Sequence, residues 1–176
     1  SFNGNGSWLA CAGNVSNTAK TITVLELHGS GGQDRGKERR VYDHDQVVNC
    51  VRFSKTNPNN NSHDQVWLAV GGHLGVTLRD FNTGSVVMSF PHEGGVTSLS
   101  WSPDSKYFAA GDADFIVDEH RPGKNIPCKA WTTVRDTRSG GVVAQYEHDT
   151  SVICQNFAGQ DGHILVTASG SRITAR

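Results

Sequence analysis

The sequence has no long hydrophobic run. No apolar stretch approaches the roughly 18 residues that a membrane-spanning helix requires, and the first residues do not show the pattern of a secretory signal peptide. Only 36% of the 176 residues are apolar. The sequence therefore predicts a soluble protein with no membrane partner.

The sequence also lacks an excess of charge of either sign. Its 16 Lys and Arg residues nearly balance its 17 Asp and Glu residues, which gives a formal net charge of −1 at pH 7. Because electrostatically driven nucleic-acid binding depends on clustered positive charge, we expect no nucleic-acid partner.

Cysteine is sparse, with four residues in the chain. Cys50 and Cys154 occupy the same position in the repeat described below, on corresponding strands of non-adjacent units. A disulfide needs Cα atoms within about 7 Å, so we expect free, mostly buried thiols, which are typical of a reducing compartment. The expected location is the cytoplasm, with the nucleus as the alternative.

What the sequence does contain is a repeated pattern. An aromatic residue, any residue, His, an acidic residue, any two residues and Val occur in this order at 42–48, 90–96 and 146–152. Another aromatic residue follows each valine five places later, at Phe53, Trp101 and Phe157. The three histidines are separated by 48 and then 56 residues. Self-similarity at such a period indicates a repeat architecture.

The sequence between the histidines is typical of short strands joined by turns. In 96–101, Leu99 and Trp101 fall on one face at a period of two residues, and Pro103 and Asp104 then favour a turn. The same analysis predicts three strands in unit 1–43, four each in units 44–91 and 92–147, and up to three in unit 148–176. The fold class is thus all-β. The predicted core comprises repeat-equivalent residues: Val51, Phe53, Leu68, Leu99, Trp101, Phe108, Phe157, Leu165 and Val166.

These residues resemble the WD-repeat β-propellers. The similarity to the repeat sequence of that family is carried by the segment from His92 to Asp112 and by the run Ala168-Ser169-Gly170-Ser171. The resemblance covers essentially the whole chain, 1–176. It implies a partial propeller of about three to four antiparallel four-stranded blades, with the first and last units, 1–43 and 148–176, incomplete. The chain is therefore expected to be a fragment of a larger propeller, an open arc with apolar surface exposed on its outer sides.

The chain departs from the family pattern at the Trp-Asp dipeptide. Arg79-Asp80 and Arg135-Asp136 stand in its place, and Leu25-Glu26 stands there in the first unit. The hydrogen-bonded tetrad of His, Ser or Thr, Asp and Trp that the resemblance implies is therefore expected to be incomplete.

Three His-acid pairs begin at His44, His92 and His148. Such pairs could be metal ligands or acid–base dyads. Adjacent blades would hold them too far apart to share one metal ion at about 2 Å. We therefore interpret the three histidines, together with Asp80 and Asp136, as structural positions, each histidine bonding within its own blade. No catalytic, cofactor-binding or metal-binding residue is predicted, and no cofactor.

The extra length of the third unit is one insertion, residues 118–129. It mixes both charges with two prolines, which lower the entropy lost when the loop orders on a partner. In the family's blades such a link lies on the same face as the repeat histidines. The candidate partner-binding residues are Asp118, Glu119, His120, Arg121, Lys124 and Lys129. The alternative is a tolerated surface insertion without a role.

The function that the resemblance implies is a non-catalytic scaffold for protein–protein interactions, with other proteins as partners. One alternative is a substrate receptor of a cullin-type ubiquitin ligase, because Asp136-Thr137-Arg138 resembles the Asp-x-Arg box of such receptors. An enzyme built on a propeller is the third hypothesis. Such an enzyme would need a cluster of acidic residues, histidines or metal ligands on one face, and the sequence predicts no such cluster.

Overall fold

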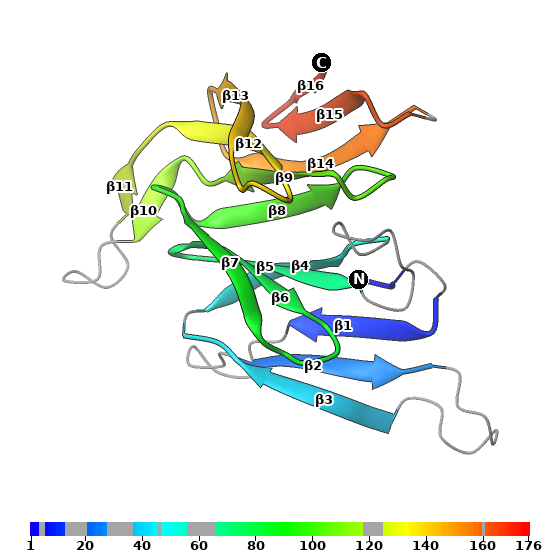
Figure 1. Ribbon diagram of the computed structural model, residues 1–176. Coiled ribbons are helices and arrows are strands. Elements are labelled where there is room, and N and C mark those ends of the chain that lie inside the picture. The colour runs from blue at the N-terminus through cyan, green and yellow to red at the C-terminus, as the bar shows by residue number, and fades with distance from the viewer. Residues whose placement is uncertain are drawn as a thin grey trace.

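The computed structural model describes residues 1–3, 6–12, 21–27, 37–45, 47–55, 66–117, 125–159 and 161–176. The described residues form strands and turns and contain no helix, so they include no helical segment long and apolar enough to span a membrane. The strands form a succession of small twisted sheets (Figure 1).

Four antiparallel sheets follow one another along the chain. The first contains β1 (Trp8–Ala12), β2 (Thr21–Glu26) and β3 (Lys37–Asp43). The second contains β4 (Val48–Phe53), β5 (Trp67–Gly72), β6 (Gly75–Asp80) and β7 (Val86–Pro91). The third contains β8 (Val96–Trp101), β9 (Tyr107–Asp112), β12 (Ala130–Asp136) and β13 (Val142–His148). The fourth contains β14 (Val152–Ala158), β15 (Ile164–Ser169) and β16 (Arg172–Ala175).

This architecture confirms the predicted all-β partial propeller with incomplete first and last sheets. The sheets have three, four, four and three strands, as the sequence predicts. The division of the chain into units 1–43, 44–91, 92–147 and 148–176 stays a prediction, because strand pairing defines sheets and not sequence repeats.

The link between β9 and β12 contains a two-stranded hairpin that the sequence analysis did not predict. In it β10 (Phe115–Val117) pairs with β11 (Asn125–Pro127) in antiparallel register. β10 therefore ends directly before the predicted insertion, and β11 lies within its second half. Residues 118–124 lie outside the described residues.

Residues 1–3 run antiparallel to β1, on the side where an inner strand would pair. Phe2 bridges Leu9, as Trp101 pairs with Phe108 in the third sheet. The Trp8 N–H donates to Asn3 Oδ1 at 2.9 Å. The same bond occurs at 2.8 Å from Trp67 N–H to Ser54 Oγ and at 2.9 Å from Tyr107 N–H to Ser102 Oγ. Residues 1–3 thus lie beside β1 at the position that β4 and β8 occupy beside β5 and β9 in the next two sheets.

Apolar side chains fill the seams between consecutive sheets. One cluster joins the first two sheets, a second joins the second and third, and a third joins the third and fourth. Seven of the nine predicted core residues are buried: Val51, Phe53, Leu68, Leu99, Trp101, Phe108 and Leu165. Phe157 and Val166, both in the fourth sheet, are only half-buried, and Phe157 packs against the cluster that joins the third and fourth sheets.

Candidate functional site

Two connections between strands lie at the same end of the sheets. One runs from β7 to β8 and carries His92, and the other runs from β9 to β12 and carries Cys128 and Lys129 (Figure 1). They meet at a cavity of about 500 Å³ at the seam between the second and third sheets. Its lining residues are Pro91, His92, Glu93, Asp112, Cys128, Lys129, Trp131, Thr133, Arg135 and Gln145. We call this surface the His92 face.

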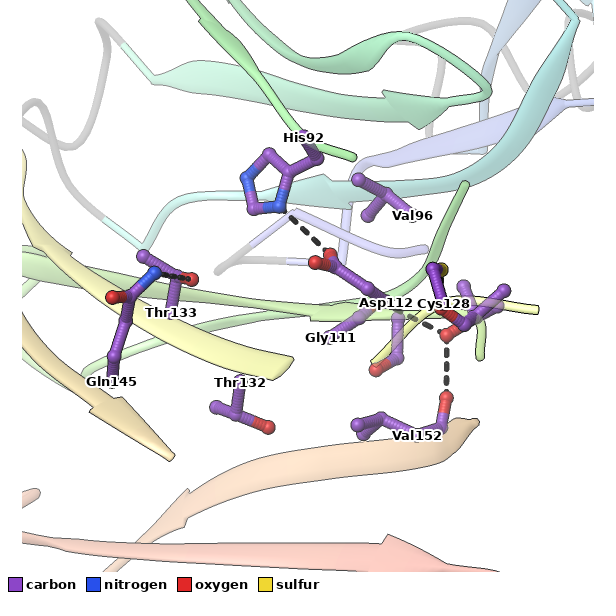
Figure 2. Close-up of polar contacts among 12 residues, drawn as sticks. His92, Val96, Gly111, Asp112, Cys128, Thr132, Thr133, Gln145 and Val152 are labelled. Atoms are coloured by element: carbon purple, nitrogen blue, oxygen red, sulfur yellow. Dashed lines mark hydrogen bonds and ion pairs between the residues drawn. The ribbon is translucent and has the colours of Figure 1, made fainter. Parts of the chain in front are cut away.

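The most deeply buried polar pair of the face is His92 and Asp112. His92 Nδ1 lies 2.7 Å from Asp112 Oδ1, and both side chains are 4% exposed (Figure 2). Burial raises the pKa of Asp112, and the nearby Glu93 carboxylate raises it further, whereas the bond to His92 opposes both effects. The second ring nitrogen, Nε2, points away from Asp112 and has no hydrogen-bond partner among the described residues.

The unpaired Nε2 reflects the residues that surround it. The three residues of β9 that precede Asp112 are Ala109, Ala110 and Gly111, none of which carries a hydroxyl. Arg135 stands where the resemblance places tryptophan. Only the His–Asp part of the expected tetrad is present on this sheet, so the tetrad is incomplete, as the sequence analysis expected.

The rim of the cavity carries charges of both signs around a half-buried ring, Trp131. Lys129 Nζ lies 2.6 Å from Glu147 Oε1, and both side chains are exposed. Cys128 is half-buried, with Sγ 3.6 Å from Ala113 O. Burial, followed by the charges of Asp112, Asp114 and Glu93, raises the pKa of its thiol. The potential on the Cys128 side of the cavity is therefore negative.

The other repeat histidines lie elsewhere. His44 is buried between β3 and β4, and burial is the main cause that lowers its pKa. His148 is the last residue of β13, and its Nε2 lies 3.0 Å from Thr132 Oγ1 in the same sheet. Burial also lowers the pKa of His148. Within the described residues, no three His, Cys, Asp or Glu side chains are grouped so that they could hold a metal ion.

Asp80 and Asp136 close the turns after β6 and β12. Asp80 Oδ1 accepts hydrogen bonds from the N–H and Oγ1 of Thr83 at 2.8 and 3.0 Å. Asp136 Oδ1 accepts corresponding bonds from Ser139 N–H and Oγ, both at 2.8 Å, and one from Arg138 N–H at 3.1 Å. These bonds lower the pKa of Asp136, led by the one from the Ser139 backbone. Both aspartates thus bond within their own turns.

The arginines that replace tryptophan bind across the seams, a role that the sequence analysis missed. Arg135 lies 4.7 Å from the centre of the Phe90 ring on β7 and donates to Gly140 O at 2.9 Å. Arg79 donates to Gly84 O at 2.9 Å and, across the seam, to Asp43 O at 3.0 Å. A signal was present, because an arginine recurs before each Asp and an aromatic residue recurs two places before each His.

The candidate partner-binding residues fall into two groups. Lys129 is described and lies on the rim of the His92 face. The others lie outside the described residues: Asp118, Glu119, His120, Arg121 and Lys124.

This fold places the chain in a class, the partial β-propellers built of four-stranded antiparallel blades. Within that class, a family model described as "WD domain, G-beta repeat" matches residues 84–117, so this segment is similar to a WD repeat. The match spans the strands from β7 to β10, including the His92–Asp112 pair. A comparison with curated proteins gives no match. WD repeats generally mediate protein–protein interactions and are typically non-catalytic scaffolds.

Proposed function

We propose that this chain is a non-catalytic scaffold that binds other proteins through the His92 face. The observation that carries this proposal is the 500 Å³ cavity at the seam of the second and third sheets. Most of its side chains project from strands or from residues directly next to strands, so they are held in place before a partner arrives.

The chemistry of the cavity suits a protein surface. Trp131 supplies an aromatic wall, Glu93 and Lys129 supply opposite charges at the rim, and Gln145 and Thr133 bond to each other at 3.2 Å. Aromatic and polar groups arranged in this way are typical of interaction hot spots. Cys128 and Lys129, which end the insertion predicted from the sequence, line the same cavity, and this supports a role for the insertion in partner binding.

The ligase-receptor hypothesis gains no specific support from the geometry. The Asp136 carboxylate of the Asp-x-Arg sequence bonds within its own turn. We therefore do not develop that hypothesis. The four free thiols support a reducing location, the cytoplasm or the nucleus, as part of the proposal.

The test compares partners captured by three forms of the whole chain. The face variant carries Glu93→Lys with Trp131→Ala. The control carries Asp104→Lys, which makes the same charge change in the β8–β9 turn, at the other end of the strands. Circular dichroism and a melting curve establish that all three are folded.

We expect the wild type and the control to capture the same proteins. The face variant should capture at least about tenfold less of them. Equal capture by all three forms would show that the His92 face is not the binding surface.

A further inference from the structure

A second cavity lies at the other end of the strands. It has a volume of about 700 Å³ and forms where the inner strands β4, β8 and β14 converge with residues 1–3. We call it the inner cavity. It shares no lining residue with the His92 face, so it is a separate candidate site.

The ionisable side chains of the inner cavity make it positive. Arg52 and Lys55 line it, and no Asp or Glu is among its described lining residues. The Arg52 guanidinium is exposed and donates to its neighbour Val51 O at 3.1 Å, without an ion pair to a described carboxylate. The site can therefore accept an anionic group without displacing an existing carboxylate from Arg52.

The cavity also contains a buried hydrogen-bond acceptor, the side-chain amide oxygen of Gln155. Gln155 lines the cavity and is 8% exposed, and its Nε2 donates to Ser98 O at 3.1 Å. Its Oε1 has no hydrogen-bond partner among the described residues. A buried unpaired acceptor costs free energy until a donor reaches it, so a ligand with an N–H or O–H group is favoured here.

The rest of the wall is apolar. Leu99 and Trp101 contribute from β8, Val166 from β15 and Ile173 from β16. Ile173 is 76% exposed, which leaves a large apolar side chain uncovered at the rim. A ligand that brings its own apolar group would cover this surface and gain hydrophobic free energy.

We propose that the inner cavity binds an extended segment of a partner protein in which an acidic side chain is next to an apolar one. The carboxylate pairs with Arg52, next to the charge of Lys55. A main-chain N–H reaches Gln155 Oε1, and the apolar side chain packs on Val166 and Ile173. An inorganic anion would satisfy the cations only, and would leave the acceptor and the apolar wall without partners. The inference rests on the proposed role in protein binding but not on the His92 face.

Three acetylated and amidated peptides serve as probes, titrated into the whole chain by calorimetry. One has the sequence GDLDLG, one carries asparagine in place of each aspartate, and one carries lysine. The variants are Arg52→Gln and Lys55→Gln. The matched control is Arg138→Gln, which removes the same charge from an exposed position on the turn after β12.

We expect the acidic peptide to bind at least about tenfold more tightly than the asparagine peptide. Arg52→Gln should remove most of that preference and Lys55→Gln part of it, while Arg138→Gln leaves it unchanged. If Arg52→Gln fails to fold by circular dichroism, Lys55→Gln and the weakening of wild-type binding between about 50 and 500 mM NaCl give the same readout.

Four results would overturn the proposal. The chain could bind the aspartate and asparagine peptides equally, or bind the lysine peptide most tightly. Arg138→Gln could reduce the preference for the aspartate peptide as much as Arg52→Gln does, or no binding could be detected at about 1 mM peptide. None of these results bears on the His92 face, because the capture experiment above reads that face alone.

Discussion

At the scale of single residues, the repeat histidines differ more than their shared sequence context suggests. His92 bonds to Asp112, twenty places later in the same expected unit. His148 is the last residue of β13 and instead bonds to Thr132, sixteen places earlier on β12 of the same sheet. Thr167, the residue of β15 at the position of Ala110 in β9, keeps a buried hydroxyl with no partner among the described residues.

The buried histidines should make stability depend on pH. Burial lowers the pKa of His44 and His148 from the usual 6.5, so the unfolded chain binds more protons than the folded chain once pH falls through that value. This contribution is complete above 6.5 and is lost as pH falls through the lower folded pKa. Between about pH 7.5 and 5.5, chemical denaturation should show a falling free energy of unfolding.

The double variant His44→Gln with His148→Gln should flatten that dependence, whereas His163→Gln, at an exposed position, should not. The raised pKa of Asp112 acts in the opposite direction at lower pH, between 3.8 and its folded value. An unchanged slope in the double variant would assign the dependence to other groups.

Trp101 is the residue whose loss should cost most. Its ring is buried against Phe108, with centroids 5.6 Å apart, and its Nε1 donates to Arg52 O at 3.2 Å across the seam. Trp101→Ala should lower the free energy of unfolding by about 3–5 kcal/mol, measured by urea titration. Val87→Ala, at an exposed position on β7, is the control. A loss of less than about 1 kcal/mol would mean that the seam does not depend on this ring.

At the scale of strands and turns, two glycines allow consecutive sheets to approach. A Cβ at Gly71 would lie 2.7 Å from Val96 Cγ1, and one at Gly111 would lie 2.6 Å from Val152 Cγ1. Each valine belongs to the next sheet, and it is the last residue of the repeated pattern. In the fourth sheet Ala168 takes the equivalent position, opposite Cys154, and no later sheet follows in the described residues.

Gly111→Ala should therefore destabilise the chain by about 1–3 kcal/mol, because the added methyl group overpacks the seam. Adding Val152→Ala should recover part of the loss by making room. Gly141→Ala, in an exposed turn with only Ser139 Oγ nearby, should be close to neutral. If Val152→Ala adds to the damage without any recovery, the close approach is not the cause.

The arginine contacts define a second link between sheets. Arg135→Gln removes the charge above the Phe90 ring and should lower the free energy of unfolding by about 0.5–2 kcal/mol. A double-mutant cycle with Phe90→Leu measures the coupling energy of this contact. A coupling energy within error of zero would show that the Arg135–Phe90 contact does not stabilise the seam. Arg138→Gln is the charge-matched control.

The strands themselves were predictable from the sequence, because alternation and turn residues are local signals. The β10–β11 hairpin was not, since its arms pair across an insertion and lack a strong alternating pattern. Strand register adds that Ser169 takes the position of Asp112 in the fourth sheet, because Ser169 pairs with Val152 as Asp112 pairs with Val96. The His92–Asp112 bond and the arginine links depend on tertiary distances that spacing alone does not reveal.

At the scale of the whole chain, the seams are unequal. Within the described residues, the buried hydrophobic clusters at the first and second seams have nine members each, whereas the cluster between the third and fourth sheets has three. Val152 is also buried at this third seam, against Gly111. The fourth sheet also exposes Ile153, Ile164 and Ile173. Because the stability of stacked repeats is approximately a sum of unit and interface terms, the fourth sheet should be the least stable part of the arc.

Native-state hydrogen exchange should resolve this difference. Amides of β14, β15 and β16 should exchange through a local opening of lower free energy than those of β8 and β9, which are packed between seams. Cysteine labelling gives an independent readout. Burial raises the pKa of Cys50 to about 12, whereas the Cys154 thiol on β14 is exposed. Cys154 should therefore react in the folded chain, and Cys50 only on global unfolding. A monodisperse monomer in which all four sheets exchange with one common free energy would contradict the inequality of the seams.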